Sequence, residues 1–423
     1  MRVREDAVPG GDVAVTPGAD EAEAIRQRRE LWRAVYVPSV LMAIGEGMLV
    51  PVLPLYVAEL GAGFALVGLA LAAEAIGMLL GDLPAGSLLR RFDRKTMMLA
   101  GVAVVGVSVA LIPSFGSVFM VVALRLVAGL GAALWGLSRH AYLTESVHAA
   151  ARGRSIAAFG GAQRIGMLVG PAVGGMIAAA FGFGAAFVAF GAVAVLAFAL
   201  CTAFLEPRPA AALEPRKRLG HRAALRQVLV QQRRLLVVAG AGQLMAQMIR
   251  SGRRIVLPLY GAAALGLDVQ AIGWVLSIAA AFDVVMFPLA GVLMDRWGRK
   301  FAIVPCFAIQ ALGMALVPLA GGFAGLALAG AVIGFGNGIG SGTMMTLASD
   351  LAPRDTMGEF LGVWRLIGDA GGMAGPVAVG AIADVVTLTS ATLVIALVGF
   401  GAAAVFAWGV PETLRREPSL AND

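Results

Sequence analysis

Residues 291–300 read Gly-Val-Leu-Met-Asp-Arg-Trp-Gly-Arg-Lys and connect two long apolar runs, at 269–292 and 302–320. Residues 86–95 read Gly-Ser-Leu-Leu-Arg-Arg-Phe-Asp-Arg-Lys and connect two similar runs 205 positions earlier. In each stretch a glycine ends one apolar segment and basic residues begin the next. A repeated basic loop between segments long enough to cross a bilayer predicts two related, membrane-embedded halves.

The composition is typical of an integral membrane protein. Of 423 residues, 59% are hydrophobic and 14% are charged, and the mean hydropathy is +0.85, which excludes a soluble domain. Apolar runs of roughly 18–25 residues have the length that crosses a hydrocarbon core as a helix. Twelve such runs are predicted, at 35–57, 65–89, 97–114, 117–142, 155–180, 184–205, 235–260, 269–292, 302–320, 323–348, 358–384 and 389–410.

The basic residues lie on one side of this topology. The formal net charge is +7, yet the six short connections on the opposite side contain no Lys or Arg. This is the positive-inside pattern, so the basic composition reports orientation rather than a nucleic-acid partner. It predicts an inner (plasma) membrane protein with both termini in the cytoplasm. The first apolar run is too long for a signal-peptide core and is interpreted as an uncleaved helix.

The sequence offers no catalytic or metal-binding pattern. Cys201 and Cys306 lie inside apolar runs, and the three histidines do not form a ligand set. There is no nucleophile–base pair, phosphate loop or zinc spacing. We therefore predict no enzymatic activity, no metal and no cofactor, with an ion gradient as the driving force for any transport.

Repeats spread over both halves define the domain organisation. Gly170-Pro171 recurs as Gly375-Pro376 at the same shift of 205, and Val-Leu-Pro-Leu-Tyr at 52–56 recurs at 256–260. Two parallel six-helix repeats with a site between them are a transporter architecture. The predicted units are a cytoplasmic tail at 1–34, a six-helix bundle at 35–205, a cytoplasmic linker at 206–234, a second six-helix bundle at 235–410 and a cytoplasmic tail at 411–423.

Charged residues inside the apolar runs follow a second pattern. The third, sixth, ninth and twelfth runs carry no charge away from their ends, whereas most of the others do. An unpaired charge at mid-bilayer costs on the order of 3 kcal/mol on insertion scales, so charged helices should face a wet interior and charge-free helices should face lipid.

The loops and several helix motifs resemble a known family. The second loop, with Gly291, Asp295, Arg296, Gly298, Arg299 and Lys300, resembles the loop signature of the major facilitator superfamily. The first loop keeps Gly86, Arg94 and Lys95 but has Arg90 in place of the acid and Asp93 in place of the second glycine. This departure leaves open whether Asp93 substitutes for the missing acid. The resemblance implies a role for these loops in gating.

The fifth predicted helix narrows the resemblance. It carries Gly166, Gly170, Pro171, Gly174 and Gly175. The first helix carries Gly45, Pro51, Val52 and Pro54, and the fourth carries Arg125, Gly129 and Gly131. Together these motifs resemble the twelve-helix drug/proton antiporter branch, in which the motif of the fifth helix is associated with exporters. Glycines four residues apart share a helix face and permit backbone contact, and proline bends a helix. A generic glycine packing seam is the alternative interpretation. The eleventh helix repeats the pattern with Gly371, Gly375 and Pro376.

Four intramembrane charges are candidates for proton coupling. Glu46 and Glu74 lie near the middle of the first two helices, and Asp283 lies in the eighth. Desolvation favours the protonated form of a carboxylate, which suits a proton carrier. Glu46 is the preferred candidate, because the resemblance implies that helix 1 lines the cavity. Arg125 in the fourth helix is either a structural ion-pair partner or a neighbour of the proton pathway.

The seventh helix carries the candidate substrate or charge network. Arg250, Arg253 and Arg254 share one helix face, and Gln243 and Gln247 extend that face. The favoured interpretation is a charge network with Glu46, and the alternative is an anion site, since guanidinium groups bind carboxylate and phosphate well. Asn337 in the tenth helix is assigned to the same set.

These observations predict an all-helical major facilitator fold and a proton-coupled exporter of small amphipathic organic compounds. The expected partners are a small-molecule substrate, protons and the lipid bilayer, and the resemblance implies a monomer. One alternative is a proton-coupled importer of an anionic metabolite. The other is a non-transporting membrane sensor or enzyme on the same fold.

The topology is directly testable. Accessibility tags at both termini and within 206–234 should be protected in intact cells, and a tag next to Gly321 should be labelled from outside. Labelling of a C-terminal tag from outside would contradict the twelve-helix arrangement.

Overall fold

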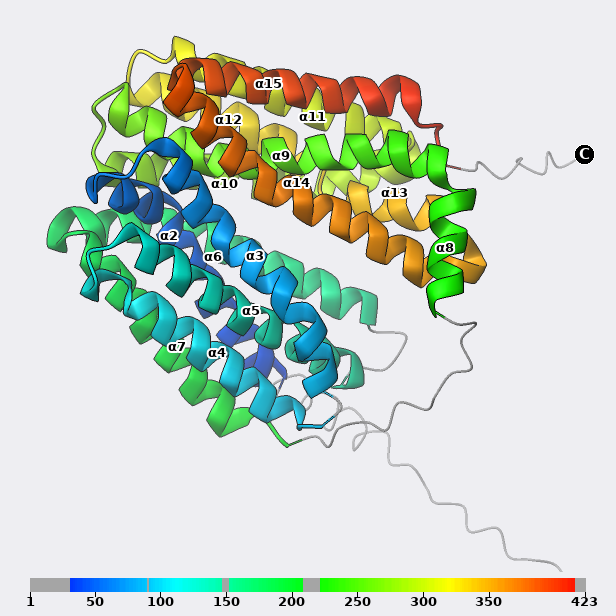
Figure 1. The fold of residues 1–423 in the computed structure, drawn as a ribbon, viewed down its shortest axis with the longest axis horizontal. Helices are drawn as coiled ribbons and strands as arrows, with labels where there is room; N and C mark the ends of the chain where they lie inside the picture. The colour runs from blue at the N-terminus through cyan, green and yellow to red at the C-terminus, as the bar shows by residue number, and fades with distance from the viewer. Residues whose placement is uncertain (1–30, 90, 147–151, 208–220, 415–423) are drawn as a thin grey trace, which may run out of the picture.

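The computed structural model describes residues 31–89, 91–146, 152–207 and 221–414. They form two helical bundles that lie side by side (Figure 1). The first half contains a π-helical turn, Trp32–Tyr36, followed by α2 Val37–Glu59, α3 Phe64–Leu88, α4 Arg94–Ala110, α5 Val118–Ser146, α6 Arg152–Phe181 and α7 Phe183–Phe204. The second half contains α9 Arg233–Ala263, α10 Val269–Arg296, α11 Arg299–Leu316, α12 Phe323–Ile339, α13 Thr343–Leu351, α14 Met357–Val385 and α15 Leu388–Ala404.

The predicted fold class is confirmed: the described chain is helical, with twelve membrane helices in two repeats. Eleven spans are long and apolar enough to cross a membrane by length and composition. The remaining helix, α9, has 31 residues and carries Arg250, Arg253 and Arg254 in its interior. Its charges, rather than its length, therefore set it apart from the other spans.

Two elements differ from the sequence-based prediction. The tenth apolar run was expected to form one helix at 323–348, but it breaks after Ile339 and resumes at Thr343. Gly338, Gly340 and Gly342 lie at this break. Gly342 has a φ of +77°, a backbone conformation that residues other than glycine rarely adopt. In addition, the linker contains a short helix, α8 His221–Gln231, which lies against the end of α14 in Figure 1.

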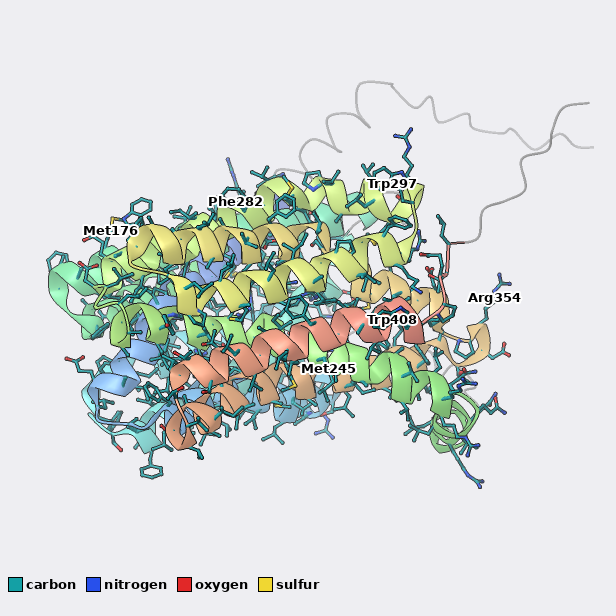
Figure 2. The ribbon with its side chains drawn as sticks, turned by 90° about the horizontal axis from the view of Figure 1, so that it is seen from above. Met176, Met245, Phe282, Trp297, Arg354 and Trp408 are labelled. Atoms are coloured by element: carbon teal, nitrogen blue, oxygen red, sulfur yellow. The ribbon has the colours of Figure 1, made fainter. Side chains whose placement is uncertain are left out.

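The charge-free helices take the predicted outer positions. In the described structure α4, α7, α11 and α15 contribute no residue to the central cavities, while Val107, Val195 and Leu397 on them are more than half exposed. Figure 2 shows apolar side chains such as Phe282 and Trp408 projecting from the outer surface. This surface suits a hydrocarbon environment, because lipid tails impose no penalty on exposed apolar groups.

The glycine motif of α6 packs directly on the backbone of α2. A Cβ at Gly166 would lie 2.5 Å from the Ala43 side chain, and one at Gly170 would lie 2.5 Å from the carbonyl oxygen of Ile44. Gly174 faces the backbone of Met48 in the same way. The backbone contact expected from the four-residue glycine spacing is therefore present.

The second half repeats this packing between α14 and α9. Gly371 faces the carbonyl oxygen of Leu244, and Gly375 faces that of Met248. The predicted glycine face of the eleventh helix, α14, thus forms a backbone contact as well. Its partner is α9, the helix with the three arginines.

The two halves meet along two seams. In one, Gly175 of α6 faces Val269 and Gly273 of α10, and in the other Gly380 of α14 faces Phe64 and Ala65 of α3. Asp384 strengthens the second seam, since its carboxylate accepts hydrogen bonds from the backbone N–H groups of Phe64 and Ala65 at 2.7 and 2.8 Å. These contacts lie at the end of the molecule opposite the loop residues 91–93 and 297–298 (Figure 1).

The other end, which carries the basic loops, is open between the halves. Figure 1 shows the bundles diverging toward it. A Cβ at Gly291 would meet nothing within 4 Å, and one at Gly86 would meet only Leu137 of its own bundle, at 3.9 Å. Gly86 and Gly291 therefore make no close helix contact in this conformation.

The loop signature forms the same three contacts in each half. Arg94 pairs with Glu145 at 3.0 Å and donates to the carbonyl oxygen of Leu89, while Lys95 donates to that of Thr202. In the second half, displaced by 205 positions, Arg299 pairs with Asp350 at 2.9 Å and donates to Met294, and Lys300 donates to Ala407. The basic residues thus tie the start of α4, and of α11 in the second half, to three neighbouring segments at the open end of each bundle.

The acidic residues of the two loops have different contacts. Asp93 accepts a hydrogen bond from the Thr96 N–H and begins α4, so it caps a helix rather than replacing Asp295. Asp295 is 82% exposed and contacts Arg299 at 3.6 Å. At Gly298 there is no side chain, and Glu412 accepts from the Arg299 and Lys300 N–H groups instead. Arg296 is exposed, and Arg90 lies outside the described residues.

The Glu412 carboxylate is held by backbone amides. Partial burial raises its pKa, but the N–H groups of Leu414, Lys300, Arg299 and Thr413 lower it more, so the net pKa lies below the ordinary 4.5. A depressed folded-state pKa stabilises the fold above the ordinary value, and this contribution is lost as pH falls through the folded-state pKa.

We expect Glu412→Ala to lower thermal stability by no more than about 1 kcal/mol, since the cap is exposed. The loss should shrink as the pH falls from 4.5 through the lower folded-state pKa, because the carboxylate of the folded wild-type protein then protonates. Glu206→Ala, at the exposed end of α7, is the control. Thermal melts of purified protein across pH check both, and equal effects of the two variants would contradict the capping role.

Candidate functional site

Between the two halves lies a cavity of about 590 Å³, and a second cavity of about 410 Å³ adjoins it. Helices α2, α3, α5 and α6 form one wall, and α9, α10, α12 and α14 form the other. Most of the predicted site residues line these cavities: Glu46, Glu74, Arg125, Asp283, Gln247, Arg250, Arg253, Arg254 and Asn337. Gln243 does not, because it is buried against Gly368 of α14.

On the first wall, Glu74 and Glu46 have different environments. The Glu74 carboxylate of α3 accepts a short charge-assisted hydrogen bond from Arg125 of α5, whose side chain is only 8% exposed. Glu46 of α2 forms no ion pair or hydrogen bond in the described structure. Arg125 therefore forms an ion pair, which was one of its two predicted roles. Glu46 is the carboxylate of this wall that has no fixed partner.

Asp283 is engaged across one seam. Arg164 of α6 donates to its carboxylate at 2.8 Å, and both side chains are largely buried. The same guanidinium donates to the Ser341 hydroxyl at the break between α12 and α13, and it lies over the Phe287 ring at 4.4 Å. Arg164 therefore links the first half to two helices of the second.

The other seam carries a second ion-pair group. Arg365 of α14 pairs with Asp82 of α3 at 3.2 Å and with Asp369 at 3.7 Å, one helical turn away. Each seam thus contains an arginine from one half bound to an aspartate of the other. Such pairs make intramembrane charge tolerable, because each partner neutralises the other.

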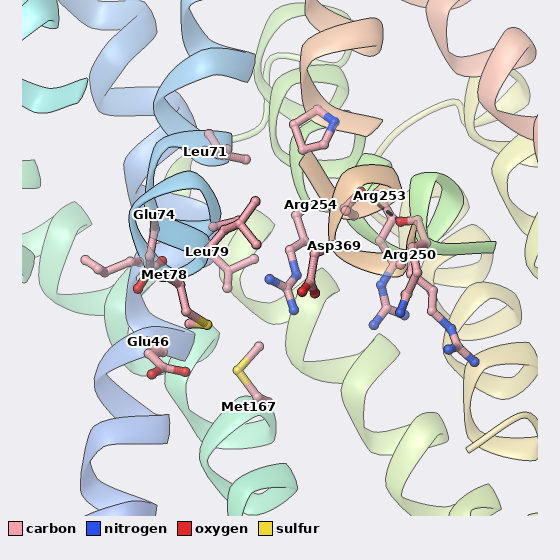
Figure 3. A pocket seen from close by; sticks show the side chains of 18 of the residues that line it. Glu46, Leu71, Glu74, Met78, Leu79, Met167, Arg250, Arg253, Arg254 and Asp369 are labelled. Atoms are coloured by element: carbon pink, nitrogen blue, oxygen red, sulfur yellow. Dashed lines mark hydrogen bonds between the residues drawn. The ribbon is translucent and has the colours of Figure 1, made fainter. Parts of the chain in front are cut away.

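The arginine face of α9 does not pair with Glu46 in this conformation. Arg250 donates to the carbonyl oxygen of Gly340 at 3.2 Å and lies over the Phe307 ring at 5.1 Å. Arg253 and Arg254 form no ion pair or hydrogen bond in the described part of the chain. Figure 3 shows the three arginines on the wall opposite Glu46 and Glu74. The predicted network with Glu46 is not formed as a direct contact.

The break after Ile339 coincides with an exchange of residues between the two halves. In the first half Trp135 of α5 packs on Gly101 of α4, and α5 continues unbroken. At the same positions 205 residues later, Gly340 faces Cys306, and a Cβ at Gly340 would lie 2.6 Å from the Cys306 Cβ. The freed carbonyl of Gly340 then accepts from Arg250 and Thr343. Irregular backbone at membrane depth is tolerated where it lines a cavity.

Sequence reasoning did not assign a site role to Arg164, Ser341, Asp82, Arg365 or Asp369. A signal was present for the four charged residues, because an intramembrane charge is by default a functional candidate. Ser341 had no such signal, since its position depends on the helix break. No group of three or more potential metal ligands occurs among the described residues.

A model of the Major Facilitator Superfamily matches residues 36–250 and 239–422. The Multidrug resistance protein MdtH of Aeromonas hydrophila is 25% identical over 394 residues, which cover 91% of this chain and 95% of that protein. The Staphyloferrin B transporter of Staphylococcus aureus is 28% identical over 179 residues, 41% of this chain and 42% of that protein.

Solved transporters share the fold at low identity. The nucleoside transporter NupG superposes with a TM-score of 0.74 at 14% identity, covering 89% of this chain and 98% of that one. The D-xylose-proton symporter superposes with a TM-score of 0.70 at 19% identity, covering 89% and 97%. These likenesses concern the fold alone.

The helix break yields a pair of matched variants. Gly340→Ala should destabilise the protein by about 1–3 kcal/mol and reduce transport, because the new methyl overlaps Cys306. Adding Cys306→Gly should restore both properties, whereas Cys306→Ala should restore them only in part, since its Cβ remains. Thermal melts and transport assays measure the series, and equal rescue by both substitutions would contradict the steric explanation.

Proposed function

The chain belongs to the Major Facilitator Superfamily, and on that premise we propose that it is a proton-coupled exporter of small amphipathic organic compounds. The single observation that carries this proposal is the cavity between the halves, which combines apolar lining with a carboxylate, Glu46, that has no fixed partner. The substrate and the proton share this cavity and move in opposite directions.

Two further observations favour export. Relatives from Aeromonas hydrophila and Bacillus subtilis are named multidrug resistance proteins, and one from Aspergillus flavipes is named an efflux transporter. The glycine motif of α6 also resembles the exporter branch, and in this chain it forms both the α2 contact and the α10 seam.

We propose that the protein lies in the plasma membrane. Following the positive-inside rule, we place the basic end of the molecule in the cytoplasm. Both termini and the linker then lie in the cytoplasm. The cavity, closed at the opposite end by the Gly175 and Gly380 seams, opens toward the cytoplasm in this conformation.

Alternating access follows from rocking of the two halves about the central cavity. The seams at Gly175 and Gly380 separate in the outward-open state, and the open ends of α3 and α10 approach the other half. Gly86 and Gly291, which have free space around them here, permit that approach because they lack side chains.

Coupling requires that proton and substrate bind the two conformations differently. Glu46 meets this requirement, because it faces the cavity and carries a charge that no ion pair fixes. Glu74 and Asp283 are already neutralised by Arg125 and Arg164, so protonating either one leaves an arginine unpaired.

The arginine face of α9 favours a second candidate, proton-coupled import of an anionic metabolite. Arg253 and Arg254 face the cavity without an acidic partner and suit an anion. Counterflow in proteoliposomes under a reversed pH gradient separates the two functions, since an exporter exchanges substrate against protons and an importer moves both together.

We expect Glu46→Gln to abolish uphill, gradient-driven transport and to leave downhill exchange partly intact, because glutamine keeps the shape but cannot titrate. Transport of a fluorescent substrate in proteoliposomes with and without an imposed pH gradient measures both. Glu59→Gln, the same change at the exposed end of α2 and outside both cavities, is the control. Uphill transport by Glu46→Gln with wild-type pH dependence would contradict the assignment.

A further inference from the structure

Most charges that line the two cavities already have a partner. Glu74 binds Arg125, Asp283 binds Arg164, and Asp82 and Asp369 share Arg365. Arg250 is hydrogen-bonded to the Gly340 carbonyl and stacked on Phe307. Within the described residues, three lining charges lack both ion pair and hydrogen bond: Glu46, Arg253 and Arg254.

These three residues lie on opposite walls. Glu46 projects from α2 in the first half, and Arg253 and Arg254 project from α9 in the second (Figure 3). All three line both cavities, so they mark the region where the two spaces join. The joined cavity therefore has a negative pole on one wall and a positive pole on the other.

Apolar side chains occupy the surface between the poles. Leu71, Met78, Leu79 and Met167 line the larger cavity, and Figure 3 places Met78 and Met167 next to Glu46. Methionine adapts its shape to irregular apolar ligands. The site thus offers a compliant apolar face flanked by two charges of opposite sign.

We propose that this transporter binds amphipathic zwitterions, with the ammonium group at Glu46, the carboxylate or phosphate group at Arg253 and Arg254, and the apolar body over Met78 and Met167. The inference rests on the proposed function and names its substrate class. Such a ligand supplies both missing partners at once, whereas a cation leaves the arginines unpaired and an anion leaves Glu46 unpaired. Guanidinium groups also bind carboxylate and phosphate with good geometry.

In this arrangement the proton and the substrate ammonium group compete for the Glu46 carboxylate. The charges that act on Glu46 come from Glu74 of α3, Arg125 and Arg139 of α5 and Arg254 of α9. Glu46 accepts either a proton or the substrate ammonium, so loading from one side requires release of the proton, and return requires its uptake. This exclusion is what exchange in opposite directions needs.

The test uses purified full-length protein and three matched probes. The first is an amino acid with a biphenyl side chain, whose ammonium and carboxylate groups lie on the same carbon. Its methyl ester is the cation-only probe, and its N-acetyl derivative is the anion-only probe. We expect the zwitterion to bind about tenfold or more tightly than either derivative in calorimetric titrations at neutral pH.

Variants assign each pole to its residues. Arg253→Gln and Arg254→Gln should weaken the zwitterion and the anion about tenfold and leave the ester unchanged. Glu46→Gln should weaken the zwitterion and the ester about tenfold and leave the anion unchanged. Arg254→Lys, which keeps the charge, should retain most of the zwitterion affinity. Arg365→Gln removes a cavity arginine that already has acidic partners and is the charge-matched control.

Several outcomes overturn the inference. If the methyl ester binds as tightly as the zwitterion, Arg253 and Arg254 do not bind the carboxylate. If the N-acetyl probe binds as tightly, Glu46 does not bind the ammonium group. An equal loss in Arg365→Gln replaces recognition with a general field effect. Thermal melts identify any variant that is unfolded. If Arg254→Gln is unfolded, Arg254→Lys replaces it in the test. Loss of zwitterion binding in a folded Arg254→Lys protein would then contradict the proposed site.

Transport measurements separate this inference from the proposed function. Preferential zwitterion binding without proton-driven transport in proteoliposomes supports the substrate class and contradicts proton-coupled export. Proton-driven transport of lipophilic cations, with no preference for the zwitterion, supports export and contradicts the substrate class.

Discussion

The cost of placing charge in a bilayer governs this structure. An ionised side chain in the hydrocarbon core is tolerated only where it is paired or reached by water. The charged helices therefore surround a central cavity, and α4, α7, α11 and α15 lie outside it. Pairing follows the same constraint, because Arg164–Asp283 and Arg365–Asp82 join the two halves at both seams. Fold and site are consequently two results of one requirement.

Glycine makes this arrangement geometrically possible. Membrane helices gain little from burying apolar surface and depend on close packing instead. Gly166 and Gly170 bring α6 onto α2, and Gly371 and Gly375 bring α14 onto α9. The neighbouring positions, Gly175 and Gly380, face the other half. A single glycine-rich helix in each half thus packs its own bundle with one face and closes the seam with another.

The halves are related but not equivalent, and the differences lie at functional positions. The basic clamps repeat contact for contact, as Arg94–Glu145 and Arg299–Asp350 show. By contrast, the pair of Trp135 and Gly101 is replaced by Gly340 and Cys306, where the helix is broken and the Gly340 carbonyl accepts from Arg250. The second half carries the three arginines of α9, and the first half carries Glu46 beside Met78 and Met167 (Figure 3).

The sequence by itself determined the twelve spans, the repeat and the loop positions, because hydrophobic length, glycine spacing and basic loops are local properties. It also identified Glu46 and the arginine face of α9, since intramembrane charge is visible in any single sequence. Only the tertiary structure decided which charges are paired, that Glu412 rather than Asp295 caps α11, and that the tenth span breaks at Gly340. These outcomes depend on which side chains meet between helices that are far apart in the chain. A local sequence pattern does not determine which of these side chains come into contact.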